Sequence, residues 1–432
     1  MSAIVVIGGQ WGDEGKGRIV DLIAQKAHIV ARYSAGNNAG HTIINELGEF
    51  KLHLVPAGIF YRDKVCIIGN GVMVDPAELL KEISNLESRG VEVKGRMFVS
   101  DRAQVLMPWH AMIDVLDEKA RGKDAIGTTG RGVGPAFQDK VGRLGIRVAD
   151  LVEHEELQSL VSFIGPKKNN VIEKLYGGEP VDLDATLEEY NDYGKRLAPY
   201  MADTGDIVQK AIKAGETVLL EGAQGALLDL DTGTYPFVTS SVPSSVAAGA
   251  AIGIGIGPTQ ISTVLGVFKA YNTRVGAGPF PTELLDSTGD MLRDGGRQPE
   301  YGSTTGRPRR CGWFDGVAAR YSSRLNGLTG AALTRLDSLD QMPSIKVCTS
   351  YNIHGKTVNT MPASLSDLNS AEPVYEELAG WMADTSAVRS FEDLPKQAQE
   401  YVHFIQDILE TPLCLISVGP ERDQAISLKG VI

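Results

Sequence analysis

The stretch Ala3-Ile4-Val5-Val6-Ile7-Gly8-Gly9-Gln10-Trp11-Gly12-Asp13-Glu14-Gly15-Lys16-Gly17 decides the fold class of this 432-residue chain. Its first five residues are a continuous apolar run closed by two glycines, the pattern of a strand buried on both faces of a parallel sheet. After Gly15 the apolar residues Ile19, Leu22 and Ile23 follow at helical spacing. The stretch therefore predicts a strand, a loop and a helix, in that order.

Further apolar runs alternate with helical stretches. The clearest helix begins with Asp75 at the N-cap and Pro76 at the first helical position, and it ends at Gly90. Such alternation is typical of a mostly parallel sheet. We predict an α/β fold, P-loop-NTPase-like, with a large central, mostly parallel β-sheet flanked by helices. The other predicted strands are His28 to Ala31, Val65 to Ile68, Met97 to Ser100, Thr217 to Leu220, Ile261 to Phe268 and Cys414 to Ser417.

The segments between these elements are interpreted as excursions from one sheet. Residues 43–55 predict a hairpin around Leu47-Gly48, and residues 151–214 predict a mainly helical segment. We expect residues 1–432 to form a single large α/β domain that carries these smaller helical and hairpin excursions.

Composition and charge narrow the class of protein. The net charge of −12 disfavours a general nucleic-acid surface, although a local basic patch could hold a small anion. The best apolar run, Val246 to Gly257, is too short to cross a membrane, and the N-terminus does not resemble a signal peptide. The four cysteines, at positions 66, 311, 348 and 414, are scattered, which suits reduced thiols. We expect a cytoplasmic protein that binds neither nucleic acid nor membrane.

Residues Gly8 to Gly17, called the glycine loop below, have the features of an anion site. Backbone N–H groups at a strand-to-helix turn form a concave site, the helix dipole adds positive potential, and Lys16 could supply a point charge. The Walker A pattern fails at both ends, because Gln10 replaces its first Gly and Gly17 replaces its metal-binding hydroxyl. An ordinary glycine-rich turn, with Asp13 and Glu14 favouring the helix N-terminus, is the alternative interpretation. A carboxylate such as Asp13 beside a phosphate requires a cation between them or a proton on the carboxylate.

Small and polar residues form a second cluster at Asn37-Asn38-Ala39-Gly40-His41-Thr42. Such residues are difficult to place in an apolar core. His41 is a candidate for acid–base chemistry, and a structural histidine is the alternative.

Six separated blocks, in one order along the chain, resemble the adenylosuccinate synthetase family. The first is the glycine loop taken with Asn38 to Thr42. The others are Gly127-Thr128-Thr129-Gly130-Arg131-Gly132, Glu221-Gly222-Ala223-Gln224-Gly225, the run from Gly233 to Ser241, the run from Thr273 to Glu283, and Ser417-Val418-Gly419-Pro420. Each block alone is common in ordinary turns, whereas the set together is highly specific.

This resemblance implies a ligase that uses GTP and Mg²⁺ to condense IMP with L-aspartate, giving adenylosuccinate, GDP and phosphate. The 6-oxo oxygen of hypoxanthine is a poor leaving group, so phosphorylating it first, as 6-phosphoryl-IMP, lets the aspartate amine displace phosphate. The resemblance implies that Asp13 takes the N1 proton and binds Mg²⁺ together with the carbonyl oxygen of Gly40. It also implies that His41 stabilises the transferred phosphoryl group and that Lys16 and Gln224 take part in catalysis.

The resemblance further implies three sets of binding residues. For GTP they are Gly12, Asp13, Glu14, Gly15, Lys16, Gly17, Gly40, His41, Thr42, Arg335, Asp337, Ser417 and Gly419. For IMP they are Asp13, Asn38, Thr129, Arg143, Gln224, Thr239 and Arg307. For aspartate they are Thr304, Thr305, Arg307 and Arg309. In the family an arginine matching Arg143 is donated across a dimer interface, so the resemblance implies a homodimer.

Two positions depart from the family pattern. Pro308 interrupts an arginine run in a loop whose guanidinium forks suit a dicarboxylate, and it should spare the flanking arginines. Arg335 replaces the lysine of the family's T-K-L-D motif, whose aspartate matches Asp337. An aspartate that accepts from guanine N1 and N2 explains the use of GTP over ATP.

Two other functions remain open at this point. A regulatory GTPase would use the loop to hold GTP, but the missing Walker hydroxyl and the arginine loop argue against it. A nucleotide-binding module without catalysis would tolerate loss of Asp13 or His41, yet both residues are present.

Overall fold

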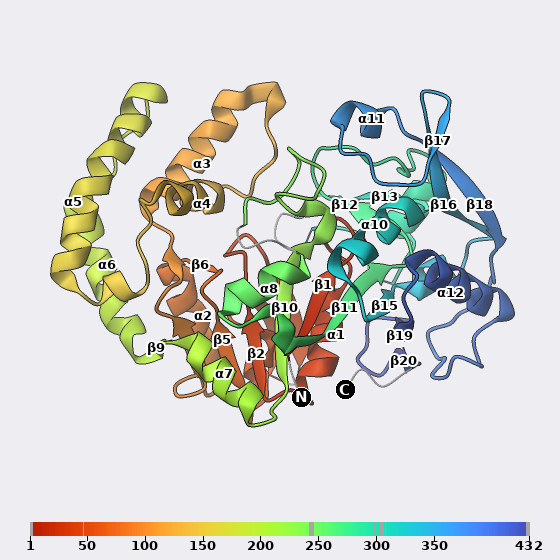
Figure 1. Cartoon of the computed structure of the whole chain (residues 1–432), viewed down its shortest axis with the longest axis horizontal. Coiled ribbons are helices and arrows are strands. Elements are labelled where there is room, and N and C mark those ends of the chain that lie inside the picture. Colours follow the sequence, from red (N-terminus) through yellow and green to blue (C-terminus); the bar gives the residue numbers. More distant parts are fainter. Residues whose placement is uncertain are drawn as a thin grey trace. The chain divides into compact units, whose positions relative to one another are not determined.

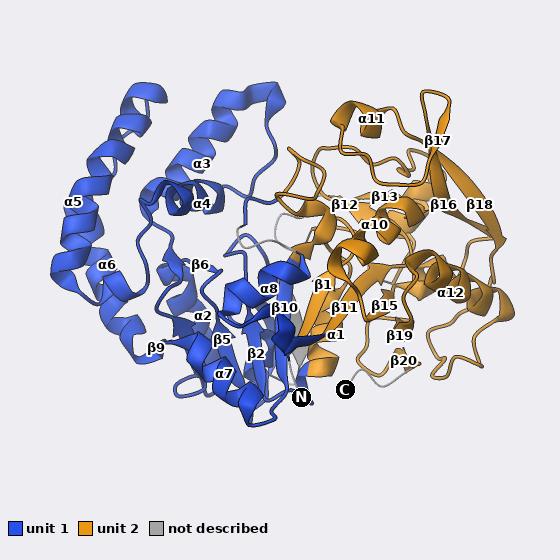
Figure 2. Ribbon diagram, viewed as in Figure 1, with its two compact units in different colours: residues 1–3, 24–223, 239–262 blue, residues 4–23, 224–238, 263–432 orange. Residues whose placement is uncertain are grey.

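A computed structural model describes residues 3–45, 47–241, 246–297, 299–302, 306 and 308–428, without the side chains of residues 41–45. The chain divides into two compact units. Unit 1 comprises residues 1–3, 24–223 and 239–262, and unit 2 comprises residues 4–23, 224–238 and 263–432 (Figure 2). The sequence predicted one domain over residues 1–432, and this organisation stays a prediction.

Unit 2 contains the first strand and most of the C-terminal half. Its strands are β1 (Ala3–Gly8), β11 (Ile261–Lys269), β12 (Asn272–Arg274), β13 (Arg310–Gly312), β14 (Phe314–Asp315), β15 (Gly330–Thr334), β16 (Ser344–Ile353), β17 (Lys356–Val358), β18 (Glu372–Ala379), β19 (Leu413–Ser417) and β20 (Ala425–Ser427). The first residue of β1 and the first two of β11 belong to unit 1. Its helices are α1 (Lys16–Ala24), α9 (Ser287–Asp294), α10 (Gly316–Asn326), α11 (Leu365–Asn369) and α12 (Lys396–Leu409).

Unit 1 contains the hairpin and most of the helices. Its strands are β2 (Ile29–Arg32), β3 (His41–Asn45), β4 (Gly48–Leu52), β5 (Val65–Ile68), β6 (Met73–Val74), β7 (Met97–Ser100), β8 (Gln104–Val105), β9 (Met201–Ala202) and β10 (Val218–Gly225), whose last two residues belong to unit 2. Its helices are α2 (Pro76–Ser88), α3 (Pro108–Arg121), α4 (Val133–Gly142), α5 (His154–Asn170), α6 (Leu183–Leu197), α7 (Thr204–Lys213) and α8 (Ala247–Ile254). β3 and β4 pair antiparallel, and α5, α6 and α7 fall within residues 151–214.

The predicted α/β architecture is confirmed. Ten strands form one sheet in the order β20-β19-β15-β11-β1-β10-β2-β5-β7-β9, flanked by helices (Figure 1). The pairs β11/β15, β15/β19, β2/β5 and β5/β7 are parallel, whereas β20 is an antiparallel edge strand. β1 is buried throughout, as its apolar run predicted. α2 begins at Pro76, with the Asp75 carboxylate accepting the Glu78 N–H at 3.1 Å.

Each unit has its own apolar core. In unit 1 the core includes Leu79 and Leu86 of α2 and Trp109 of α3. In unit 2 it includes Phe268 of β11 and Tyr401 of α12. The four cysteines are buried, and none of them forms a disulfide bond.

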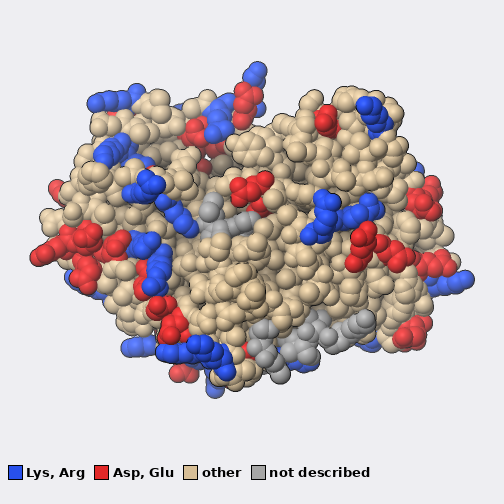
Figure 3. All heavy atoms as spheres, viewed as in Figure 1, with Lys and Arg blue, Asp and Glu red and all other residues tan. Residues whose placement is uncertain are grey.

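Two surface properties follow from the described residues. No described helix is both long and apolar enough to span a bilayer. On the face shown in Figure 3, basic and acidic side chains are interspersed, so neither sign forms a continuous field there.

Asp315 is a buried carboxyl that begins α10. It accepts the Ala318 N–H at 3.1 Å and the Tyr351 hydroxyl at 2.6 Å, and its side chain has no exposed surface. Burial raises the pKa of Asp315 to about 6, because the charged form loses its hydration. A raised pKa means that protonated Asp315 favours the folded state. This contribution is full below the unfolded pKa near 3.8 and is lost as pH rises through about 6.

We therefore predict that Asp315→Asn removes a pH-dependent part of the stability of unit 2. As the pH rises from 4 to 7, the wild type should lose stability that the variant does not lose. The difference should amount to about 3 kcal/mol at most. Thermal unfolding of both proteins across this range measures the difference. Tyr351→Phe removes a donor to the ionised carboxylate, so it should steepen the loss with rising pH. A variant whose stability differs from the wild type by the same amount at pH 5 and pH 8 would contradict the prediction.

Candidate active site

The loop after β1 has a tight, glycine-dependent conformation. Gly12 and Gly15 have positive φ values of 87° and 81°, and so does Asp13, at 59°. A Cβ on Gly9 would lie 2.2 Å from the Phe268 ring, so only glycine fits there. The loop therefore places Asp13 in a left-handed conformation three residues before the start of α1.

Glu14 places its own carboxylate among the loop's donors. It accepts the N–H groups of Gln10 and Gly12 at 3.0 and 2.9 Å and pairs with the Lys16 ammonium at 2.7 Å. Burial alone would raise the pKa of Glu14, but Lys16 and the backbone donors more than offset it, so this pKa is lowered. The predicted anion site of the loop thus holds an internal anion, and Lys16 neutralises it.

Gln10 explains one departure from the Walker pattern. Its side-chain amide donates to the carbonyl oxygens of Lys269 and Tyr271 at 3.1 and 3.3 Å and to Asn272 Oδ1 at 3.0 Å, and its oxygen accepts the Lys269 N–H at 2.9 Å. A glycine could make none of these bonds. Gln10 therefore fixes the loop to the end of β11, a role that the sequence analysis missed.

Asp13 is half-exposed and pairs with an arginine from the predicted aspartate loop. Its Oδ2 lies 2.8 Å from Arg309 Nε, and 39% of its side chain is exposed. Among the described residues, Arg309 is its only ionic partner. The structure thus brings together Asp13 and Arg309, which the sequence placed in two different binding sets.

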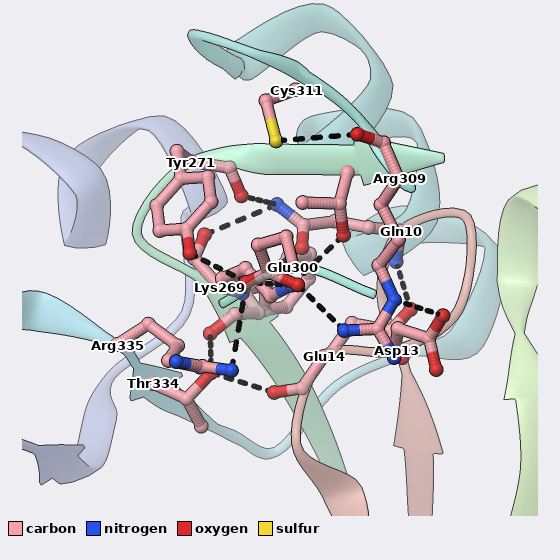
Figure 4. Close-up of polar contacts among 12 residues, drawn as sticks. Gln10, Asp13, Glu14, Lys269, Tyr271, Glu300, Arg309, Cys311, Thr334 and Arg335 are labelled. Atoms are coloured by element: carbon pink, nitrogen blue, oxygen red, sulfur yellow. Dashed lines mark hydrogen bonds and ion pairs between the residues drawn. The ribbon is translucent and has the colours of Figure 1, made fainter. Parts of the chain in front are cut away.

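Arg309 is anchored in turn by Glu300, a fully buried carboxylate that the sequence analysis did not identify (Figure 4). Arg309 Nη1 donates to Glu300 Oε2 at 2.6 Å. Glu300 Oε1 accepts from Lys269 Nζ at 2.8 Å and from the Tyr271 hydroxyl at 2.6 Å. Burial acts to raise the pKa of Glu300, but the neighbouring cations outweigh it and lower this pKa to about 2.

The T-R-L-D and S-V-G-P motifs follow adjacent strands. β15 and β19 pair in parallel, so Arg335 to Asp337 and Ser417 to Gly419 leave the sheet at the same edge. Arg18 of α1 donates to Ser417 Oγ and to the Glu421 carbonyl oxygen, and it faces Asp337 electrostatically. Arg18 is therefore a further candidate residue beside Ser417 and Asp337, and the sequence analysis missed it.

Asp337 has an unsatisfied oxygen. Only 9% of the residue is exposed, and among the described residues its buried Oδ1 has no hydrogen-bond partner. Burial raises the pKa of Asp337, partly offset by Arg335. An unpartnered buried carboxylate oxygen is costly unless a ligand donates to it.

Unit 1 carries several of the other predicted residues. The Asn37 amide donates to Asp75 at 2.6 Å, and Asn38 Oδ1 accepts the Gly36 N–H at 3.1 Å. His53 Nδ1 lies 2.8 Å from the Ala39 carbonyl oxygen, beside Gly40. These contacts fix the chain just before His41.

The loop that contains Thr129 is held from α3. Glu118 accepts the N–H groups of Ile126, Gly127 and Thr128 at 3.1, 2.7 and 3.1 Å, and Thr129 itself is exposed. Arg143, at the C-cap of α4, is also exposed and has a φ of 61°. Thr239 Oγ1 lies 3.1 Å from Ser241 Oγ. Among the described residues, Asn38, Thr129, Arg143 and Thr239 share unit 1 but do not hydrogen-bond one another.

Gln224 lies at the end of β10, within unit 2. Five predicted residues fall outside the described part: the side chains of His41 and Thr42, and the whole of Thr304, Thr305 and Arg307.

Comparisons with known proteins agree on one family. The family model described as adenylosuccinate synthetase matches residues 5–426. The adenylosuccinate synthetase of Heliobacterium modesticaldum is 52% identical over 428 residues, covering 99% of each chain. That of Carboxydothermus hydrogenoformans is 52% identical over 431 residues, covering 100% of each. The fully ligated adenylosuccinate synthetase of Plasmodium falciparum matches with a TM-score of 0.92 and 36% identity, over 99% of this chain and 100% of that one. A cyanophage S-2L succinoaminodeoxyadenylate synthetase, with a TM-score of 0.61 and 20% identity, shares the fold.

Proposed function

The chain belongs to the adenylosuccinate synthetase family, and we propose that Asp13, with Arg309, lies at its catalytic centre. The protein is a ligase that uses GTP to join IMP and L-aspartate, giving adenylosuccinate, GDP and phosphate through 6-phosphoryl-IMP. This step begins the conversion of IMP to AMP in purine biosynthesis. The residue roles below are proposals, and the observation that carries them is the half-exposed Asp13 carboxylate held by Arg309.

Asp13 acts as the base that takes the N1 proton of IMP. Removing that proton makes the 6-oxygen nucleophilic enough to attack the γ-phosphorus of GTP. The arrangement supports this role, because Arg309 holds Asp13 through one oxygen while part of the carboxylate remains exposed. A base must be oriented yet accessible, and Asp13 is both.

Arg309 binds the aspartate substrate. Among the described residues, its Nη1 donates to Glu300, and its Nε lies 2.8 Å from Asp13 Oδ2 in an ion pair that is not aligned as a hydrogen bond. Its Nη2 is then the nitrogen left to donate to a substrate carboxylate. Thr304, Thr305 and Arg307 complete this set by their resemblance to the family.

Phosphate binding involves the glycine loop. Its backbone N–H groups lie at the N-terminus of α1, where the helix dipole favours an anion. Because Glu14 already accepts from Gln10, Gly12 and Lys16, the GTP phosphates have to share or displace these contacts. Gly15, Gly17, Gly40, His41 and Thr42 are assigned to GTP by resemblance.

Asp13 also fits a magnesium ion. Mg²⁺ prefers hard oxygen ligands and is usually held by one or two carboxylates together with substrate phosphates and water. In the described part of the chain no three acidic, histidine or cysteine side chains gather as a metal cage, so the protein would supply few ligands. We assign Asp13 and the carbonyl oxygen of Gly40 to Mg²⁺, which when bound would neutralise phosphate charge.

We assign recognition of the guanine base to Asp337. Its buried, unpartnered Oδ1 supports an acceptor for the guanine N1 and N2 donors. Ser417 and Gly419 leave the sheet at the same edge as Asp337. The Arg335 guanidinium can stack on the base. This assignment concerns unit 2 alone.

The IMP phosphate is assigned to Asn38, Thr129, Thr239 and Arg143, and the hypoxanthine ring to Gln224. Hydroxyl and amide donors suit both tasks. We propose that Arg143 is donated to the neighbouring subunit of a homodimer, which its exposed position at the end of α4 supports. The four buried cysteines form no disulfide bond, which supports a cytoplasmic location.

We predict that Asp13→Asn loses turnover by about 10²-fold or more while it retains GTP binding, because the base is removed and the backbone donors remain. Coupled turnover measured by ultraviolet absorbance, together with equilibrium GTP binding, separates the two effects. Turnover of the variant close to that of the wild type would refute the role of Asp13 as base.

Asp337→Asn should weaken GTP and favour XTP, because an asparagine amide can donate to the 2-oxo group of xanthine. The expected result is a KM for GTP raised by about tenfold or more, with XTP becoming the better substrate. Asp340→Asn is the matched control, because this neighbouring carboxylate accepts from Trp381 and Thr385 instead. An unchanged ratio of GTP to XTP activity in Asp337→Asn would rule out guanine recognition by this residue.

The shared site can be tested by mixing two inactive proteins. In a hybrid of Asp13→Asn and Arg143→Leu subunits, one site combines both wild-type residues, so random reassociation should restore about a quarter of wild-type activity. The measurement is turnover after the two variants are dissociated and reassociated together, with each variant treated alone as the control. No recovery, with hybrid dimers demonstrated, would show that Arg143 does not cross between subunits.

A further inference from the structure

Glu300 is the most buried member of the charge cluster in unit 2, and no role proposed above uses it. The residue has no exposed surface. Its two oxygens are divided between partners: Oε1 accepts from Lys269 Nζ at 2.8 Å and the Tyr271 hydroxyl at 2.6 Å, and Oε2 accepts from Arg309 Nη1 at 2.6 Å. Figure 4 shows the Arg309 guanidinium between Glu300 and Asp13.

Glu300 and Arg309 also flank one chain segment. The Arg309 N–H donates to the Glu300 carbonyl oxygen at 2.9 Å. The residues next to this pair, Tyr301 and Pro308, form an isolated antiparallel bridge. A side-chain ion pair and a backbone bond therefore close the base of the segment 301–308.

The Glu300 carboxylate also lies close to a residue assigned to GTP. Arg335 Nη2 lies 3.6 Å from Glu300 Oε1, and Arg335 is two residues from Asp337. Glu300 thus stands between an arginine assigned to aspartate and an arginine assigned to GTP.

We propose that Glu300 is a positioning residue for the ligase reaction. It orients Arg309, so that one guanidinium holds Asp13 and binds the substrate carboxylate, and it restrains Arg335 beside the guanine. This inference rests on the proposed function of Asp13, Arg309 and Arg335, and it adds a residue that acts through them without touching a substrate.

Charge explains why a carboxylate is needed at this position. Lys269, Arg309 and Arg335 bring three positive charges, whereas Glu300 and Asp13 bring two negative ones. Without Glu300, two of these cations would be buried beside each other with little compensation, and Asp13 alone would face Arg309. The five groups together carry one excess positive charge, which suits an anionic substrate.

The decisive variant is Glu300→Gln, which keeps the shape and removes the charge. We expect the KM for aspartate to rise by about tenfold or more, the KM for GTP to rise less, and the KM for IMP to stay within about twofold. A merely structural role would reduce the amount of folded enzyme and hence kcat, leaving each KM unchanged. A KM for aspartate within about twofold of the wild type would overturn the proposal.

The matched control is Glu283→Gln. Glu283 pairs with Arg310, the residue next to Arg309, and among the described residues it has no hydrogen bond or ion pair with Lys269, Arg309 or Arg335. This variant also removes a carboxylate partner from an arginine, the one that follows Arg309 directly in the chain. We expect all three KM values to stay within about twofold. A rise in the KM for aspartate as large as that in Glu300→Gln would overturn the specific role of Glu300.

A second variant keeps the test valid if Glu300→Gln fails to fold. The double substitution Glu300→Gln with Lys269→Met removes one negative and one positive charge, so the cluster keeps its net charge while Arg309 still lacks its anchor. We expect a raised KM for aspartate in this protein too, and a wild-type value would overturn the proposal. Asp13→Asn is measured alongside: if it retains turnover the proposed site is wrong, whereas if only the Glu300 variants behave as wild type the site stands and Glu300 has no positioning role.

Discussion

The ion pair between Arg309 and Asp13 is the constraint on which the proposed chemistry depends. Asp13 lies in a left-handed conformation that costs an L-residue free energy, so the loop must hold it there. Glu14 holds the loop from within, through Gln10, Gly12 and Lys16. Arg309 then fixes the direction of the carboxylate. A base oriented before substrate arrives needs less reorganisation during the reaction.

Glu300 extends this constraint into the core of unit 2. Through Lys269 it is linked to the end of β11, and Gln10 links the glycine loop to the same strand end. Loop, strand and arginine are therefore parts of one hydrogen-bonded framework. The two departures from the family pattern fit this framework. Pro308 leaves the Arg309 N–H free to bond Glu300, and the Arg335 guanidinium lies within ionic reach of the same carboxylate.

Local patterns predicted much of the fold. The strand β1 was predicted from a run of consecutive apolar residues, and the start of α2 from the adjacent pair Asp75-Pro76. Both predictions are confirmed. β15 was missed because Gly330-Ala331-Ala332 lacks the branched residues that indicate a strand, and only its neighbours β11 and β19 define it. The framework residues were missed for a related reason. Gln10 bonds residues about 260 positions away, and the burial of Glu300 depends on strands that meet only in the fold. Motif resemblance identified Asp13 and Arg309 separately, but not their contact.

Phosphoryl transfer to IMP can be followed without the second half of the reaction. GTP carrying ¹⁸O in the β–γ bridge is incubated with enzyme, Mg²⁺ and IMP, without aspartate, and movement of the label into a non-bridging β-position is measured by phosphorus NMR. Reversible transfer to the 6-oxygen moves the label, because the freed β-phosphate of bound GDP can rotate. We predict IMP-dependent exchange in the wild type and its loss in Asp13→Asn. Exchange at the wild-type rate in that variant would contradict it.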